Sequence, residues 1–298
     1  MPRITIGLPV FNGAALIDEC LENLAHQSHV DFEVIISDNA STDGTSEICA
    51  RFCDKDPRFR HIVHPKTTSA NQNFLFARDL ADCDYFAFRA YDDLAAPDFL
   101  ERLSGVLSQA PTARLAVGSI RQEFEAEKKP RKYPYPLTPE EDLGEVKGRI
   151  LQQMWNGHAS WFYGLWRHQE LTQSYDRVLR EYDDPWGCDH LIILHAMLQD
   201  GVRGVQHGAE FTQRVLRTPR HYIPASRPSY AEMVGRNAHF ERTARHLLEE
   251  SGLNASDRLA VSRKISMFTY RRCHGYKRLA QAKMKSILRG KPKLHWKK

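Results

Sequence analysis

The sequence predicts an α/β fold, in which a mainly parallel sheet is followed by a helical extension. Short apolar strands alternate with amphipathic helices through the first third of the chain, and polar residues gather where these strands end. The last part of the chain carries helical patterns rich in Lys and Arg. Alternating strands and helices form right-handed β-α-β units, whose ligand crevice lies at the carboxyl ends of the strands.

The composition is that of a soluble globular protein with a sizeable core. The 298 residues are 42% hydrophobic and 27% charged, which suits one large domain or two small ones. No uninterrupted apolar stretch reaches the roughly 18 residues of a membrane-spanning helix. No cleavable signal is expected before the first apolar run at Ile4, and the six cysteines include no Cys-x-x-Cys pair. Free thiols in a reducing cytoplasm are therefore expected.

The first predicted unit is a strand followed by a helix. Apolar residues alternate in RITIGLPV, and the segment from Pro9 to Gly13 ends the strand. The next segment places four apolar residues at helical spacing, as a stripe that packs on a sheet: Ile17, Cys20, Leu21 and Leu24.

The same alternation continues to about residue 100. FEVIIS is a short apolar run typical of a parallel strand covered on both faces, and Ser41 or Thr42 is expected to cap the next helix. RFRHIV and DYFAF predict two more strands, with a helix in NQNFLFARDLA between them. Polar residues following three of the four strands should then converge on one site: Asn12, Asp38, Asn39, Asp92 and Asp93.

Asp92 and Asp93 are adjacent carboxylates directly after an apolar strand. Adjacent acids often lie on solvated loops, but this position favours a hard divalent cation whose other ligands are phosphates and water. Asp38, beside a loop with free backbone donors, suits a nucleobase edge and ribose.

Taken together, GLPVFNGAALIDECLENLAHQS, VIISDNASTDGT and YFAFRAYDDLAAPDFLE resemble family 2 glycosyltransferases of the GT-A fold. The resemblance covers residues 3–120 closely and continues loosely to about Arg217. It implies a Rossmann-like, nucleotide-sugar-binding sheet with a C-terminal helical extension. It also implies inverting transfer of a sugar from a nucleotide diphosphate to a glycan or lipid-linked acceptor, in bacterial surface polysaccharide or glycolipid synthesis. We expect a catalytic domain over 1–220, with a nucleotide-sugar half (1–120) and an acceptor half (121–220), and a basic helical extension over 221–298.

The family's nucleotide-binding roles carry over to matching positions. Pro9, Val10 and Asn12 resemble the loop that borders the nucleobase. Asp38 and Asn39 resemble the acidic pair that holds uracil or ribose, although the second acid is an amide here. Asn71 and Asn73 fall where the family often begins a helix that approaches the nucleotide.

The resemblance makes Asp92 a ligand of ribose and metal, and Asp93 the main protein ligand of Mn²⁺ or Mg²⁺. Such a cation stabilises the charge of the departing diphosphate. Ala90 stands where many relatives carry a third acid, so a weakly held metal is expected.

Asp189 is the predicted catalytic base. It opens an apolar helical run in DDPWGCDHLIILHAML, where the helix dipole favours its ionised form, and it resembles the family's second acidic motif. Capping of the helix is an alternative role, compatible with the first if only one carboxylate oxygen is committed. Asp183 and Asp184 lie nearby and are expected to face solvent.

Two further segments resemble parts of the acceptor and phosphate sites. His158 and Trp161 lie in an aromatic segment that flanks the acceptor in the family, although core packing explains most of these aromatics. Arg214 and Arg217 fall in a basic loop that closes over the diphosphate, where surface salt bridges are an equal explanation.

The charge of the chain is uneven. Residues 258–298 contain 14 Lys and Arg and no Asp or Glu. A solvated helix or an anionic partner, phospholipid or nucleic acid, explains this equally well. The apolar residues among the cations suit an anionic membrane surface, so a cytoplasmic protein held at the inner face of the membrane is expected.

Three classes of function therefore remain: a glycosyltransferase, a catalytically silent nucleotide-sugar-binding scaffold and a nucleic-acid binder. The missing third acid and Asn39 suit the second class. The third has only the basic tail in its favour, because no RNA- or DNA-binding motif accompanies it, and nucleic acid is not an expected partner.

Overall fold

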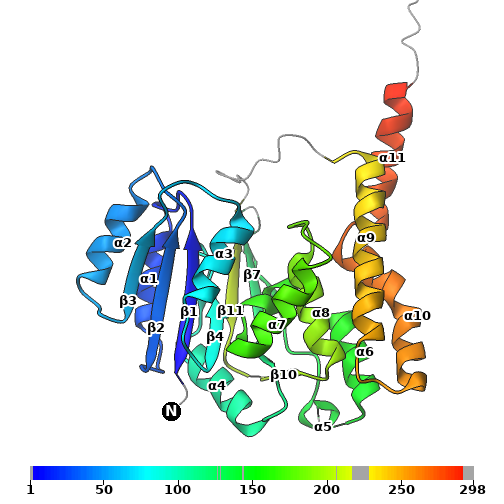
Figure 1. Ribbon diagram of the computed structural model, residues 1–298, viewed down its shortest axis with the longest axis horizontal. Helices are drawn as coiled ribbons and strands as arrows, with labels where there is room; N and C mark the ends of the chain where they lie inside the picture. The colour runs from blue at the N-terminus through cyan, green and yellow to red at the C-terminus, as the bar shows by residue number, and fades with distance from the viewer. Residues whose placement is uncertain are drawn as a thin grey trace, which may run out of the picture.

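A seven-stranded sheet forms the centre of the protein (Figure 1). The computed structural model describes residues 3–290 except 126, 128, 143, 206 and 217–227. Strand order is β10-β6-β9-β4-β1-β2-β3. The strands are β1 (Ile4–Val10), β2 (Phe32–Asp38), β3 (Phe59–Val63), β4 (Tyr85–Phe88), β6 (Leu115–Val117), β9 (Leu165–Arg167) and β10 (Val202–Gly204). Only β9 runs antiparallel to its neighbours, so the predicted mainly parallel sheet is confirmed.

The first three helices between the strands follow the predicted pattern: α1 (Ile17–Ala25), α2 (Thr45–Cys53) and α3 (Ala70–Asp79). A further helix, α4 (Phe99–Gln109), follows β5. The four apolar residues of the α1 stripe are fully buried. The predicted cap of α2 is wrong, because the residue before this helix is Gly44, at φ 93°, and no side chain caps it. Ser41 and Thr42 are instead bonded to the loops of the site described below.

A second, four-stranded sheet lies beside the first in the order β5-β11-β7-β8. Its strands are β5 (Leu94–Ala95), β11 (Phe211–Val215), β7 (Ile120–Phe124) and β8 (Arg131–Tyr133). Because β5 directly follows Asp93 and pairs with β11, this sheet brings Arg214 next to the two carboxylates.

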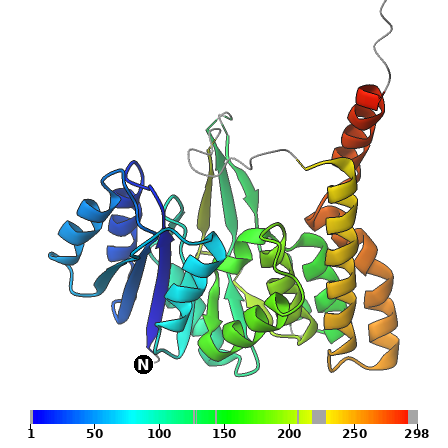
Figure 2. The same ribbon diagram turned by 45° about the horizontal axis from the view of Figure 1, so that its top comes forward.

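Helices form the C-terminal side of the protein (Figure 2). They are α5 (Pro139–Asp142), α6 (Val146–Asn156), the 3-10 helix η1 (Ala159–Tyr163), α7 (His168–Leu179), α8 (Cys188–Leu198), α9 (Tyr230–Glu249), α10 (Ala255–Arg272) and α11 (Tyr276–Gly290). The predicted C-terminal helices are thus present. α9 packs on α8 and α10, and α10 packs on α6. Phe240, Leu247 and Ile265 of this region belong to the same hydrophobic core as Leu191 of α8.

α11 extends away from the body in both views (Figures 1 and 2). Its Tyr276 and Met284 side chains are 66% and 63% exposed. Among the residues that the structure describes, no helix has the length and apolar character needed to cross a membrane. All six cysteines are free thiols, as predicted.

Candidate active site

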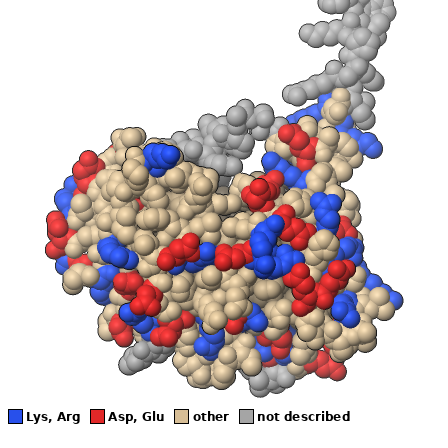
Figure 3. Space-filling model, in the orientation of Figure 1, with Lys and Arg blue, Asp and Glu red and all other residues tan. Residues whose placement is uncertain are grey.

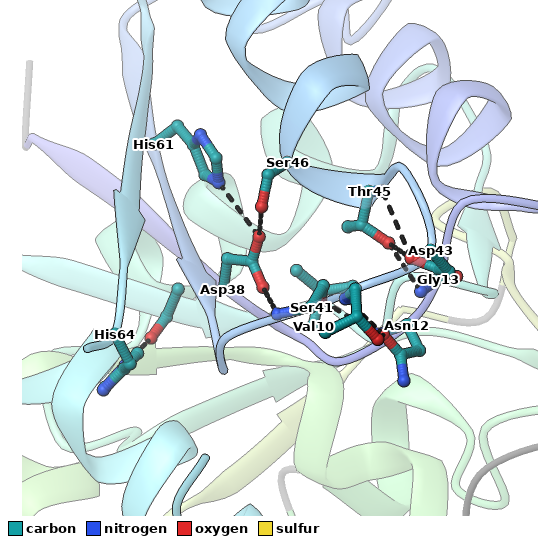
Figure 4. Close-up of polar contacts among 12 residues, drawn as sticks. Val10, Asn12, Gly13, Asp38, Ser41, Asp43, Thr45, Ser46, His61 and His64 are labelled. Atoms are coloured by element: carbon teal, nitrogen blue, oxygen red, sulfur yellow. Dashed lines mark hydrogen bonds and ion pairs between the residues drawn. The ribbon is translucent and has the colours of Figure 1, made fainter. Parts of the chain in front are cut away.

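The loops after β1 and β2 are joined by hydrogen bonds (Figure 4). The backbone N–H of Asn12 donates to Ser41 Oγ at 2.9 Å, and its Oδ1 accepts from the Thr42 N–H at 2.8 Å. The next N–H, that of Gly13, donates to Thr45 Oγ1 at 2.9 Å. Asn12 has φ 51°, in the left-handed region that Asn tolerates better than most residues. The NASTDGT segment therefore shapes the first loop as well as its own.

Asp38 organises this pair of loops from inside. Its side chain is fully buried, and its oxygens accept hydrogen bonds from the Ser41 N–H and from the Ser46 hydroxyl. His61 Nε2 lies 3.4 Å from the same carboxylate (Figure 4). Burial alone would raise the pKa of Asp38, but the bonds from His61, Ser41 and Ser46 lower it to about 2. The carboxylate is therefore ionised and committed to the loop.

Asn39 and Asn73 are likewise committed to the protein. The Asn39 amide accepts from the Thr68 N–H at 2.8 Å and donates to the Thr68 carbonyl at 2.9 Å. Asn73 donates to the carbonyls of Ser37 and Val10, at the ends of β2 and β1, and accepts from the Ser37 hydroxyl. Both side chains are less than 5% exposed.

These contacts correct part of the predicted nucleotide site. Pro9, Val10, Asp38, Asn39 and Asn73 come together as predicted, but their side chains are buried. Their geometry builds the loops at the carboxyl ends of the strands and does not present free groups to a ligand. Asn12 remains partly exposed.

The Asp92–Asp93 pair lies on the turn between β4 and β5. Asp93 is 3% exposed, and its Oδ1 accepts from the Arg214 N–H at 2.9 Å. Among the described residues, no donor bonds its Oδ2. Burial, with Asp92 as a second cause, raises the pKa of Asp93 to about 7, and burial also raises the pKa of Asp92. The pair therefore lacks enough positive charge to hold both carboxylates ionised at neutral pH.

Two arginines face this pair with unused donors. Arg214 bonds the Asp92 carbonyl and the Glu19 carboxylate, while its buried Nη2 has no partner among the described residues. Arg89 is 1% exposed and lies over the rings of Phe99 and Phe211, and within the described part of the chain its Nε and Nη1 have no partner. A buried N–H without an acceptor is costly, so these donors favour an oxygen-rich anion at the site.

Asp189 is the second residue of α8, after Gly187 in the left-handed region at φ 87°. Its Oδ1 accepts from the His190 N–H at 2.8 Å, and no donor among the described residues bonds Oδ2. Burial raises the pKa of Asp189 to about 6, against the bonds from the helix N-terminus and the charge of Arg272. Burial thus outweighs the dipole effect expected from the sequence. One oxygen is free for a second role.

Tyr163 lies close enough to both acidic groups for their charges to affect its pKa. Its ring stacks on Phe211 with centroids 5.2 Å apart. Burial raises the pKa of its phenol well above the usual value, and the charges of Asp93, Asp189 and Asp92 raise that pKa further. The carboxylate pair and Asp189, almost a hundred residues apart in sequence, therefore act on one side chain.

The two predicted acceptor residues have structural contacts. His158 Nδ1 accepts from the Ser160 N–H at 3.1 Å and caps η1, and burial lowers the pKa of this ring to about 4. Trp161 is 2% exposed and packs on Tyr135. A buried ring offers no face to a sugar, so the predicted role of Trp161 at the acceptor is wrong.

Arg217, the second arginine predicted to bind the diphosphate, lies outside the described residues.

No group of three or more His, Cys, Asp and Glu side chains within the described part of the chain could hold a metal. Asp92 and Asp93 still fit a divalent cation, because they are adjacent, Asp93 is buried and Asp92 half-buried, and among the described residues only the Arg214 N–H bonds the Asp93 carboxylate. Such a cation would take most of its ligands from phosphates and water.

The residues 5–172 match the model of the family described as "Glycosyl transferase family 2". The chain belongs to glycosyl transferase family 2. The matched range includes both joined loops and the Asp92–Asp93 turn. The family resemblance of the sequence is thereby confirmed.

Curated relatives agree with this membership. A Bacillus subtilis (strain 168) protein described as the uncharacterized glycosyltransferase EpsJ is 23% identical over 189 residues, which are 62% of this chain and 52% of that protein. A Haemophilus influenzae uncharacterized glycosyltransferase is 34% identical over 106 residues, 34% of this chain and 41% of that protein. The chain thus spans about half or less of the length of these relatives.

Solved structures share the fold. Staphylococcus aureus TarS 1–349 in complex with UDP-GlcNAc superimposes with a TM-score of 0.65 over 90% of this chain and 73% of that chain, at 13% identity. The mannosyltransferase PcManGT of Pyrobaculum calidifontis, in complex with GDP-Man and Mn²⁺, gives 0.53 over 98% and 76%, at 17% identity. The predicted GT-A fold with a C-terminal helical region is confirmed.

Sequence reasoning missed three residues at this site: Tyr163, Arg89 and Arg272. Tyr163 sits among many aromatics, and Arg272 among many basic residues, so neither stands out. Arg89 could have been found, because a charged residue at the end of the apolar run YFAF is unusual for a buried strand.

Proposed function

We propose that the chain is an inverting, metal-dependent glycosyltransferase that moves a sugar from a nucleotide diphosphate to a hydroxyl of a glycan or lipid-linked acceptor. Bacterial surface polysaccharide or glycolipid synthesis is the proposed process. One observation carries the proposal: in a chain of this family, the buried Asp93 carboxylate follows β4 beside Asp92, and no donor among the described residues bonds its Oδ2. Family membership and the structural relatives solved with UDP-GlcNAc and with GDP-Man support a nucleotide-sugar donor.

Asp93 and Asp92 would hold Mn²⁺ or Mg²⁺, and Arg214 Nη2 would donate to the diphosphate. The metal, when bound, supplies positive charge to the leaving phosphate. PcManGT was solved with Mn²⁺, which supports this choice of ion. Arg217 is a second proposed phosphate ligand. Asn12 and the loops built by Pro9, Val10, Asp38, Asn39 and Asn73 would border the nucleoside.

Asp189 is the proposed base. Its Oδ2 would take the proton of the acceptor hydroxyl while the hydroxyl oxygen forms a bond to the anomeric carbon. The bond from the anomeric carbon to the phosphate oxygen breaks in the same step, and the nucleotide diphosphate leaves. Attack opposite the leaving group inverts the anomeric centre. A pKa of about 6 leaves Asp189 ionised yet basic near neutral pH.

A thermal-shift screen of nucleotide diphosphate sugars, with and without Mn²⁺, tests the donor part. We expect one donor to raise the Tm of the wild type with Mn²⁺, and Asp93→Ala to lose this metal-dependent rise. If no donor changes the Tm under either condition, the proposed function is wrong.

Transfer assays test the base. Asp189→Asn should lower kcat by about 10²–10⁴-fold, the usual contribution of a general base. Its donor-induced Tm shift should equal that of the wild type. Unchanged turnover in this variant would exclude Asp189 as the base.

A catalytically silent nucleotide-sugar-binding protein is the alternative. The metal motif favours this alternative, because Ala90 stands where many relatives carry an acid, and Asp92 and Asp93 are the two carboxylates of the motif. Donor binding without turnover across a broad acceptor panel would support it.

We also propose a division into a catalytic domain (1–220), with donor (1–120) and acceptor (121–220) halves, and a basic extension (221–298). The extension would hold a cytoplasmic protein at the inner face of the membrane. The C-terminal segment 258–298 carries 14 Lys and Arg and no Asp or Glu, whereas Lys and Arg are interspersed with Asp and Glu on the face seen in Figure 3. That segment includes residues 291–298, which lie outside the described part of the chain.

A further inference from the structure

A groove of about 540 Å³ lies between α6 and α10, apart from the acidic residues described above. Its volume is within the range of about 300–1,000 Å³ that is usual for small-molecule sites. Its apolar walls include Leu151, Trp155, Met267 and Phe268. Trp155 is 46% exposed, although it is a large apolar side chain. The groove thus presents apolar surface to solvent that the described part of the protein does not cover.

The charges of the groove have one sign. Its charged lining residues are Lys264 and Arg271, and no acidic side chain lines it within the described part of the chain. Arg271 lies over the Trp155 ring, with its guanidinium carbon 4.0 Å from the ring centroid. Apolar walls beside two cations complement a molecule with an apolar chain and an anionic group.

The groove adjoins the proposed base. Arg272 Nη2 donates to the carbonyls of Met154 and Trp155, at 3.2 and 3.3 Å, both in residues that line the groove. The charge of this guanidinium opposes the rise in the pKa of Asp189. On the same side, Phe268 meets the ring of His190, the neighbour of Asp189, edge to face at 6.5 Å. A ligand in the groove would lie behind the residues that surround Asp189.

We propose that this groove binds the apolar chain and phosphate of a lipid-phosphate-linked acceptor, with Lys264 and Arg271 facing the phosphate. The inference rests on the proposed glycosyltransferase function and specifies its acceptor as a lipid phosphate. A concave, ligand-sized groove suits one lipid molecule better than the flat surface of a bilayer.

Gly148 allows a direct test, because it lines the groove and a Cβ at this position meets no atom within 4 Å. Gly148→Leu would place an apolar side chain at the groove from a Cβ position that is free of contacts. Gly235→Leu is a matched control on α9, since it also lies in a helix, has open space around its Cβ and does not line the groove. Neither change should lower the Tm, because leucine favours helix more than glycine does.

Isothermal titration of the full-length protein with farnesyl phosphate, below its micelle concentration, is the experiment. We expect the wild type and Gly235→Leu to bind it equally, and Gly148→Leu to bind it at least about tenfold more weakly. Arg271→Glu should also weaken binding about tenfold, whereas Arg263→Glu, on the same helix outside the groove lining, should not. Farnesol and inorganic phosphate should each bind more weakly than the combined molecule.

Equal binding by Gly148→Leu and wild type, or no binding of farnesyl phosphate, would overturn the inference. A second result would also overturn it: Arg271→Glu loses binding to phosphatidylglycerol vesicles, while the wild type does not bind farnesyl phosphate. That result would indicate contact with a bilayer. The change in Tm caused by a nucleotide-sugar donor distinguishes failure of the groove proposal from failure of the proposed glycosyltransferase function. If a donor stabilises the wild type but farnesyl phosphate does not bind, only the groove proposal fails.

Discussion

Asp93 is a carboxylate whose surroundings suit a neutral or cation-bound state. It is 3% exposed, and burial raises its pKa to about 7. An acid with a raised folded-state pKa stabilises the fold at low pH, and this contribution is lost as the pH rises through that pKa. In the absence of metal, the protein should therefore lose stability between about pH 4 and 7.

Asp93→Asn should reverse this loss, because the amide stays neutral and can still accept from the Arg214 N–H. We expect the variant to be more stable than the wild type by roughly 1–4 kcal/mol at pH 8 in chelator, and by less at pH 5. Urea unfolding at the two pH values measures the difference. Asp98→Asn is the control of opposite sign, since burial raises the pKa of Asp98 but its bond with Arg102 lowers it overall. A wild type more stable than Asp93→Asn at pH 8 would contradict the prediction.

The start of α8 is the element that positions Asp189. Gly187 precedes this helix at φ 87°, and a Cβ on it would lie 3.1 Å from the Phe240 ring of α9. Both the backbone angle and the contact require glycine. The packing of α9 on α8 therefore determines where the helix begins, and hence where the Asp189 carboxylate lies.

Gly187→Ala should lower the free energy of unfolding by about 1–2 kcal/mol, because alanine is strained in the left-handed region. It should also reduce transfer while donor binding stays unchanged. Gly235→Ala, inside α9 in open space, should instead raise stability by about 0.4–1 kcal/mol. Denaturant unfolding and transfer assays of both variants test this; full activity in Gly187→Ala would show that α8 can shift without effect.

At the scale of the whole molecule, the C-terminal helices share the core of the sheet domain and reach the acidic site. Arg272, the last residue of α10, bonds carbonyls of α6 and lowers the pKa of Asp189. The extension is therefore part of the surroundings of the proposed base, although it lies some eighty residues further along the chain.

In Arg272→Met, the rise of kcat with pH should occur at a higher pH than in the wild type. In the wild type we expect kcat to rise with pH up to about 6, as Asp189 loses its proton, and then to level off. Removing a nearby cation disfavours the ionised carboxylate, so the limb shifts upward. A pH–rate profile of each protein is the measurement, with Arg263→Met as the control on the same helix. Superimposable profiles for Arg272→Met and wild type would contradict this coupling.

The basic tail can be tested on the whole protein as well. Residues 281–298 carry seven Lys and Arg, and cations near an anionic surface contribute about 1 kcal/mol each. A chain ending at residue 280 should bind anionic vesicles at least about tenfold more weakly at low salt, with no difference on neutral vesicles. Equal co-sedimentation of both chains would remove the membrane role of this segment.

The sequence by itself determined the first four strands of the central sheet, the helices between them, the C-terminal helices and the family. Alternating apolar residues and short polar breaks are local signals, and burial of the α1 stripe follows directly from its spacing. The same signals placed Asn12, Asp38 and Asp93 at strand ends, which parallel pairing brings to one edge.

Only the tertiary structure decided what those residues contact. Ser41 does not cap α2, because Asp38 and Asn12 take its polar groups, and Trp161 faces the core, because Tyr135 covers it. The proximity of Tyr163 to both Asp93 and Asp189, and the reach of Arg272 to Asp189, depend on elements far apart in the chain. Burial and charge act through space, and a pattern within one segment cannot report which distant segment will supply them.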